Sequence, residues 1–200
     1  MARAGAAVVA LVAWAGIAVQ FAAVFGRTGS VAATLWGLVA YFTILTNLLV
    51  AALCTALAVR GPEAVAPRWS AGAALAIVLV GVVYWLLLRG LLDPSGGDLL
   101  ADRLLHTAVP VLMPLYWLAY VRKGALVAGD PLRWALYPLA YLGYALARGA
   151  VTGRYAYPFL DVAALGAAAT LGNTVAIAAG FLVAGAALVW LDRRLGRAGV

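Results

Sequence analysis

The chain has 200 residues, of which 66% are hydrophobic and only 10% are charged, with a formal net charge of +7. This composition is typical of an integral membrane protein whose surroundings are mostly lipid. The positive charge does not indicate a nucleic-acid-binding protein, because the basic residues stand singly or in small groups at the ends of apolar segments. A single cysteine, Cys54, excludes an intramolecular disulfide framework. We therefore expect one membrane domain, residues 1–200, with the lipid bilayer as its principal partner.

Six apolar segments are predicted to form membrane-spanning helices, because about 20 consecutive apolar residues in a helix cross the hydrocarbon layer of a bilayer. They cover about residues 4–25, 34–59, 69–91, 99–121, 132–149 and 171–191. Turn-rich sequences separate several of them, and the longest connection, 150–170, contains VTGRYAYPFLD. The expected fold is therefore an all-α integral membrane protein with six transmembrane helices.

The basic residues indicate how these helices are oriented. Six crossings place both termini on one side of the membrane, and nine of the 14 basic residues fall on that side. The nine are Arg3, Arg60, Arg68, Arg122, Lys123, Arg133, Arg193, Arg194 and Arg197, against Arg27, Arg89, Arg103, Arg148 and Arg154 on the other. Because loops rich in Lys and Arg remain inside, we expect a multi-pass protein of the cell membrane with cytoplasmic N and C termini.

The chain's only histidine, His106, lies inside the apolar segment 99–121. An ionisable group within a membrane-spanning helix costs about 2.5–3.5 kcal/mol or more on insertion scales, so it usually has a function or a partner. At about 1.5 Å per residue, His106 would lie roughly 11 Å and Thr43 roughly 12 Å below the outer ends of their helices. Thr46 and Asn47 follow Thr43 at i+3 and i+4 and extend a polar stripe. Thr43 and His106 can therefore meet if their helices are neighbours.

The helix of His106 carries further polar and irregular features. Asp102 precedes His106 by four residues and is placed to hold its other ring nitrogen, which would fix the tautomer. Pro110 has no N–H, so the carbonyl of His106 is expected to lose its helical partner, with a kink or widened turn just below the histidine. A helix interrupted in this way usually lines a cavity or packs against other polar protein groups.

Each of these residues also has a purely structural interpretation. A threonine in a membrane helix can bond to the carbonyl four residues earlier, Asn47 can join two helices, and Arg148 can extend from a helix end to the interface. A lone intramembrane histidine can serve as a proton relay or an interhelical hydrogen bond. A threonine hydroxyl needs an adjacent base to become a nucleophile, however, so a threonine and a histidine at one depth favour catalysis.

Other catalytic and metal-binding motifs are missing from the sequence. It contains no G-x-S-x-G, H-E-x-x-H or Walker motif, and its three serines lie outside the interiors of the predicted helices. One histidine, one cysteine and one glutamate do not indicate a metal site. We expect neither a metal nor an organic cofactor.

Three segments together resemble one family of membrane proteins. VTGRYAYPFLD at 151–161 resembles the signature loop of the androgen-induced and androgen-dependent TFPI-regulating proteins. HTAVP at 106–110 resembles their histidine helix, and YFTIL at 41–45 resembles their threonine helix. Family members are six-helix membrane proteins, and the animal members look like threonine hydrolases of fatty acid esters of hydroxy fatty acids. The chain is similar to a bacterial branch of this family.

The resemblance implies roles for individual residues. The family's catalytic threonine falls on Thr43 and its histidine on His106, and Asp161 is the acidic residue that closes the loop motif. Two departures are visible: the segment reads T-I-L-T-N, so Thr46 competes with Thr43, and Pro110 comes one residue early. The resemblance thus implies a threonine nucleophile without deciding which threonine it is.

The leading hypothesis is a membrane-embedded esterase whose lipid-ester substrate enters from the outer leaflet. Thr43 would attack the acyl carbonyl, and His106 would take its proton and later protonate the leaving alkoxide. The imidazole would be oriented by an acidic residue, either Asp102 or Asp161. The oxyanion would accept a hydrogen bond from one of three candidates: Asn47, Tyr157 and Arg148.

Two alternatives from other functional classes remain open. The first is a non-enzymatic, proton-linked transporter in which His106 and Asp161 titrate along a proton pathway. The chain shows no convincing internal repeat, which argues against an inverted-repeat transporter. The second alternative is a structural membrane protein, in which the polar groups only hold helices together.

Overall fold

The computed structural model describes residues 1–91 and 93–198, and the regular structure in this part of the chain is entirely helical. The α-helices are α1 Ala2–Thr28, α2 Val31–Leu38, α3 Phe42–Arg60, α4 Pro67–Val83, α5 Gly96–Arg103, α6 Val109–Tyr120, α7 Asp130–Thr152 and α8 Val162–Ala198. A π-helical turn at Tyr84–Leu88 extends α4, and another at Leu104–Ala108 joins α5 to α6. Short 3-10 turns lie at Pro62–Ala64 and Pro158–Leu160.

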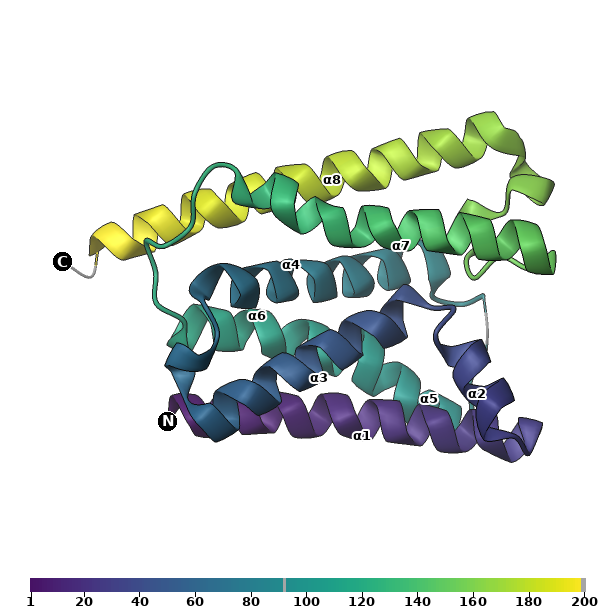
Figure 1. Ribbon diagram of the computed structural model, residues 1–200, viewed down its shortest axis with the longest axis horizontal. Helices are drawn as coiled ribbons and strands as arrows, with labels where there is room; N and C mark the ends of the chain where they lie inside the picture. The colour runs from purple at the N-terminus through teal and green to yellow at the C-terminus, as the bar shows by residue number, and fades with distance from the viewer. Residues whose placement is uncertain (92, 199–200) are drawn as a thin grey trace.

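The helices run along the long axis of the molecule, and α4 lies at their centre (Figure 1). It packs against α3 and α6 on one side and against α7 and α8 on the other. The helix α1 packs against α3, α5 and α6, and α8 forms the outer edge with α7 (Figure 1). Both chain ends lie at the same end of the molecule, which we call the terminal end (Figure 1).

Within the described residues, four helices are long and apolar enough to cross a membrane: Ala2–Thr28, Phe42–Arg60, Pro67–Leu88 and Val162–Arg197. In a bilayer every backbone polar group must find a partner inside the protein, and long continuous helices meet this requirement by themselves. The chain is therefore an all-α protein with several helices that suit a multi-pass membrane protein.

The predicted continuous helix 34–59 is wrong, because the chain leaves the helical path at residues 39–41 between α2 and α3. No proline marks this break in the sequence. The carbonyl groups that the break releases are satisfied from α7: the Tyr141 hydroxyl donates to the carbonyl of Ala40 at 2.7 Å, and the Arg148 guanidinium donates to that of Trp36. The partners that stabilise the break thus lie about a hundred residues away in the sequence.

The predicted start of the last helix at residue 171 is also wrong, because α8 begins at Val162 and carries a non-helical residue at Gly166. Its first turn is capped by Asp161, whose Oδ1 accepts a hydrogen bond from the backbone N–H of Ala164 at 3.0 Å. The connection expected over 150–170 is correspondingly shorter, since α7 continues to Thr152.

The widened turn near His106 is present, but it includes the histidine and does not lie below it. The N–H of Val109 donates to the carbonyl of Leu104, five residues earlier, as in a π-helix. In this register the residue opposite the carbonyl of Leu105 is Pro110, which has no N–H. The side chain of Asn47 on α3 donates to this carbonyl at 3.3 Å. The carbonyl of Leu105 therefore has its partner on another helix.

Gly81 allows α4 to approach the helix of His106 closely. A Cβ atom at this position would lie 2.9 Å from Cβ of Pro110, whereas a Cβ atom at Gly143 on α7 would meet no atom within 4 Å. We expect Gly81→Ala to lower the free energy of unfolding by about 1–3 kcal/mol, since overpacking forces the helices apart. Gly143→Ala should be neutral or stabilising, because alanine is the better helix former. Thermal unfolding in detergent micelles checks this, and equal midpoints for both variants would contradict it.

Candidate active site

Thr43 and His106, which are 63 residues apart in the sequence, lie within hydrogen-bond distance. The atoms Oγ1 of Thr43 and Nε2 of His106 are 3.2 Å apart. Thr43 belongs to the first turn of α3, so its backbone N–H has no carbonyl partner within the helix. The side chain of Thr43 is buried, with 6% of its surface exposed. A hydroxyl group and an imidazole thus meet at the start of a helix, away from bulk solvent.

The other ring nitrogen of His106 is held by Asp102, as the i, i+4 spacing predicts. Nδ1 of His106 lies 2.9 Å from Oδ1 of Asp102. An Nδ1–H that donates to this carboxylate leaves Nε2 without a proton, so Nε2 can accept one from the Thr43 hydroxyl. The three side chains form a continuous hydrogen-bonded series from a hydroxyl through an imidazole to a carboxylate.

Tyr84 completes this series and was missed by the sequence analysis. Its hydroxyl donates to Oδ2 of Asp102 at 2.6 Å, and its ring stacks on that of His106 with 4.2 Å between centroids and 10° between planes. Tyr84 begins the π-helical turn that extends α4, and His106 lies within the second π-helical turn. Both contacts join segments that are distant in sequence, so the apolar segment around Tyr84 contained no signal for its role.

Tyr157, from the loop between α7 and α8, lies on the other side of Thr43. Its hydroxyl oxygen is 3.4 Å from the backbone nitrogen of Thr43 and 3.5 Å from Oγ1. The Thr43 N–H donates to this oxygen, so the hydroxyl of Tyr157 can still donate its own proton towards Oγ1 of Thr43. The ring of Tyr157 stacks on Phe159 at 5.1 Å between centroids, which holds the buried hydroxyl in place.

Asn47 connects the segment of Thr43 to that of His106. Its Nδ2 group donates to the carbonyl of Thr43 at 2.8 Å and to that of Leu105 at 3.3 Å. Both amide hydrogens are therefore used, and none remains for a developing oxyanion. Asn47 thus acts as a structural bridge between the two segments, which is the simpler of its two interpretations.

The remaining predicted residues lie outside the Thr43–His106 contact. Thr46 shares a hydrogen bond of 3.0 Å with the Tyr137 hydroxyl. Arg148 donates to the Tyr144 hydroxyl at 2.7 Å and to a carbonyl at the α2–α3 break. Asp161 caps the first turn of α8. The structure therefore brings Thr43, His106, Asp102 and Tyr157 together and gives Thr46, Arg148 and Asp161 other partners.

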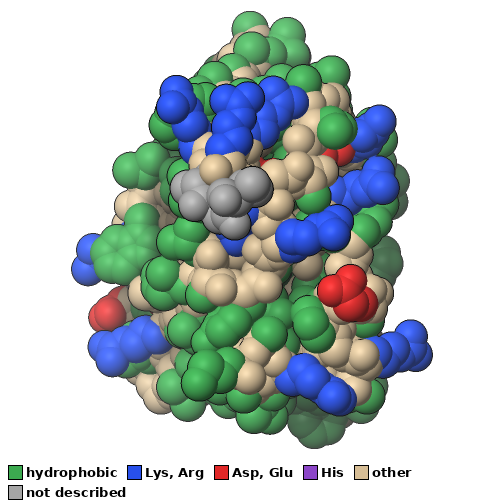
Figure 2. Space-filling view, turned by 90° about the vertical axis from the view of Figure 1, so that its left-hand side faces the viewer, with side chains coloured by type: hydrophobic (Ala, Val, Ile, Leu, Met, Phe, Trp, Pro, Cys, Tyr) green, Lys and Arg blue, Asp and Glu red, His purple; other side chains and the backbone are tan. Residues whose placement is uncertain are grey.

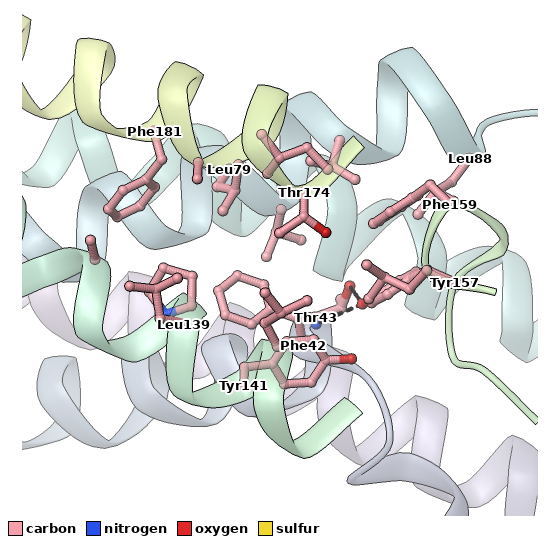
Figure 3. Close-up of a pocket in the computed structure, with 18 of the residues that line it drawn as sticks. Phe42, Thr43, Leu79, Leu88, Leu139, Tyr141, Tyr157, Phe159, Thr174 and Phe181 are labelled. Atoms are coloured by element: carbon pink, nitrogen blue, oxygen red, sulfur yellow. Dashed lines mark hydrogen bonds between the residues drawn. The ribbon is translucent and has the colours of Figure 1, made fainter. Parts of the chain in front are cut away.

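An apolar cavity of about 150 Å³ adjoins Thr43 and Tyr157. Figure 3 shows the labelled side chains of Leu139, Tyr141 and Phe181 around this space, with Thr43 beside it. The lining comes from α3, α4, α7 and α8 and from the loop that carries Tyr157, and nearly all of it is hydrophobic. His106 does not line the cavity, so the hydroxyl of Thr43 lies between an apolar space and the imidazole.

This geometry can activate a hydroxyl group. An imidazole within 3.2 Å can take the hydroxyl proton, and a carboxylate on its far nitrogen stabilises the resulting imidazolium. The Tyr157 hydroxyl supplies a hydrogen-bond donor beside the same oxygen. The arrangement suits nucleophilic attack by Thr43 on an electrophilic carbon in the cavity.

We expect Tyr84→Ala to make His106 react several-fold faster with diethyl pyrocarbonate, because the stacked ring that covers one face of the imidazole is removed. Tyr84→Phe keeps the ring and should react like the unchanged protein. Leu86→Ala is the control on the same turn, since Leu86 is 76% exposed. Mass spectrometry of the single histidine-containing site gives the rates, and the same rate in Tyr84→Ala as in Leu86→Ala would contradict the stacking.

Comparisons of the chain with protein-family models, with curated proteins and with solved structures gave no match. The three segments that resemble one family nevertheless meet in space. Thr43 comes from YFTIL, His106 from HTAVP and Tyr157 from VTGRYAYPFLD. Nε2 of His106 and the hydroxyl oxygen of Tyr157 both lie within 3.5 Å of Oγ1 of Thr43.

Proposed function

We propose that this protein is a membrane-embedded hydrolase of lipid esters, of the type formed by a fatty acid and a hydroxy fatty acid, with Thr43 as its nucleophile. The single observation that carries the proposal is the hydrogen-bonded series from Thr43 through His106 to Asp102 at the edge of an apolar cavity. The resemblance of three segments to a family of threonine hydrolases supports the same assignment.

The reaction proceeds in two halves. In the first, Oγ1 of Thr43 bonds to the acyl carbon while its proton moves to Nε2 of His106. The tetrahedral intermediate then collapses: the bond to the alcohol oxygen breaks, and His106 gives its proton to the leaving alkoxide. In the second half a water molecule attacks the acyl-threonine, His106 takes a proton from the water, and Thr43 recovers its own proton as the fatty acid leaves.

Two groups stabilise charge during these steps. Asp102 holds the imidazolium that forms after the first proton transfer, and the Tyr84 hydroxyl binds the second oxygen of the same carboxylate. Of the three candidates, Tyr157 is the oxyanion donor, because its hydroxyl is 3.5 Å from Oγ1 of Thr43, whereas Asn47 and Arg148 donate to other groups. A positioned donor of this kind is worth about 10²–10³-fold in rate.

The charge distribution supports a position for the site within a bilayer. We infer six crossing segments, with α5 and α6 forming one and α7 another, and with both termini in the cytoplasm of the cell. Lys and Arg side chains gather on the terminal end, where acidic side chains are few (Figure 2), which agrees with the positive-inside rule. The site lies near the opposite end of the helices, which would place it in the outer half of the membrane.

Thr43→Ala and His106→Ala are each expected to abolish labelling by a fluorophosphonate probe and to lower the rate of lipid-ester hydrolysis by at least ~10³-fold, because either change removes the activated nucleophile. Intact mass and peptide mapping locate the adduct. Thr46→Ala is the matched control and should leave labelling unchanged, since Thr46 lies on α3 like Thr43 but its hydroxyl bonds to Tyr137 on α7. Hydrolysis that survives Thr43→Ala would overturn the mechanism.

The orientation is tested with single cysteines at the two ends of the molecule. Glu63→Cys lies in the exposed turn between α3 and α4 at the terminal end, and Ser95→Cys lies at the opposite end before α5. In intact cells a membrane-impermeant maleimide should label Ser95→Cys at once and Glu63→Cys only after the membrane is opened. The native Cys54 is fully buried and serves as the unlabelled background. The reverse pattern would invert the proposed topology.

A further inference from the structure

A second apolar space lies directly behind the cavity that adjoins Thr43. This groove, of about 320 Å³, is formed by α4 with its π-helical turn and by α8. Four side chains line both spaces, and they form a shared wall between them: Leu79, Val83, Ile177 and Phe181. The groove and the cavity are therefore neighbouring compartments along one path from the outer edge of the molecule to Thr43.

The outer side of this path faces the surroundings of the helices. α8 forms the edge of the molecule in Figure 1, and Val175 and Val183 on it are 57% and 71% exposed. On the groove, α8 contributes the small residues Ala176, Gly180 and Ala184, which leave room between it and α4. In a bilayer the space outside these residues is occupied by hydrocarbon chains.

The size of the inner cavity limits how much of a chain it can hold. A cavity of about 150 Å³ lined by aliphatic and aromatic side chains is large enough for one benzene ring, that is, for roughly six carbon atoms. A longer acyl chain whose carbonyl lies at Thr43 must therefore continue beyond the cavity. Beyond the shared wall, the rest of the chain would lie in the groove.

Resting on the proposed function, we propose that the substrate is an ester of a long-chain fatty acid whose acyl chain extends from Thr43 through the cavity, past Leu79 and Phe181, and into the groove between α4 and α8. The seam between these two helices is then the lateral entrance from the lipid. The alcohol part of the ester lies on the other side of Thr43, towards His106, which protonates it as it leaves. The wall side chains change rotamer to let the chain pass.

Gly180 offers a way to fill the groove without disturbing the fold, because a Cβ atom there would meet no atom within 4 Å. Gly172, on the same helix, is equally free of neighbours but lines neither space. Gly180→Leu and Gly180→Trp therefore fill the groove in two steps, and Gly172→Trp is the matched control.

The kinetic test compares nitrophenyl palmitate with nitrophenyl butyrate in detergent micelles. We expect Gly180→Trp to lower kcat/KM for the palmitate by about tenfold or more, and Gly180→Leu to lower it by an intermediate factor. The kcat/KM for the butyrate should change by less than about twofold in both variants. Gly172→Trp should leave kcat/KM unchanged for both substrates. An equal loss for both esters in Gly180→Trp, or no loss for the palmitate, would overturn the acyl path.

A binding test separates this inference from the proposed function. A palmitate ester with a diazirine at the end of its chain is irradiated with the Thr43→Ala protein, which cannot hydrolyse it under the proposed mechanism. Adducts on α4 and α8 side chains of the groove that disappear in Thr43→Ala/Gly180→Trp support the path even if no ester is hydrolysed. If neither Gly180→Trp nor Gly172→Trp changes the adducts, the proposed acyl path is refuted.

Discussion

The site depends on the requirement that backbone polar groups find partners when no water is available to bond them. Two irregularities in the helices create it: the break between α2 and α3 and the π-helical turn around His106. Each releases carbonyl groups that would cost several kcal/mol in hydrocarbon if left unpaired. Tyr141 and Arg148 satisfy those of the break, and Asn47 satisfies that of the turn. The surrounding helices therefore stabilise the irregular backbone on which the reactive groups stand.

These irregularities also explain why the reactive atoms can meet. A continuous helix over 34–59 would use the N–H of Thr43 in its own hydrogen-bond ladder, whereas after the break this group donates to the Tyr157 hydroxyl. The π-helical turn shifts the register of the residues around His106 by one position relative to an α-helix. At this helix start the buried hydroxyl of Thr43 lies between the His106 imidazole and the Tyr157 hydroxyl.

Several of the polar residues predicted for the site have contacts that support the backbone. Arg148 satisfies a carbonyl and lies 4.0 Å over the ring of Trp36, and Asp161 caps α8. Asn47 uses both of its amide hydrogens on carbonyls. In a protein with only 10% charged residues, each buried polar group has few possible partners, so neighbouring polar side chains have different partners. Tyr157 lies beside Thr43, and Tyr84 lies beside His106.

The sequence by itself determined the features that depend on composition or on local spacing. Apolar length indicated membrane helices, the i, i+4 spacing paired Asp102 with His106, and Pro110 indicated an irregular turn. Only the tertiary structure decided the break at 39–41, the contacts of Tyr84 and Tyr157, and the different partners of Thr43 and Thr46. The physical reason is that these features are stabilised by hydrogen bonds from side chains far away in the chain, and local sequence does not show which distant helix will supply them.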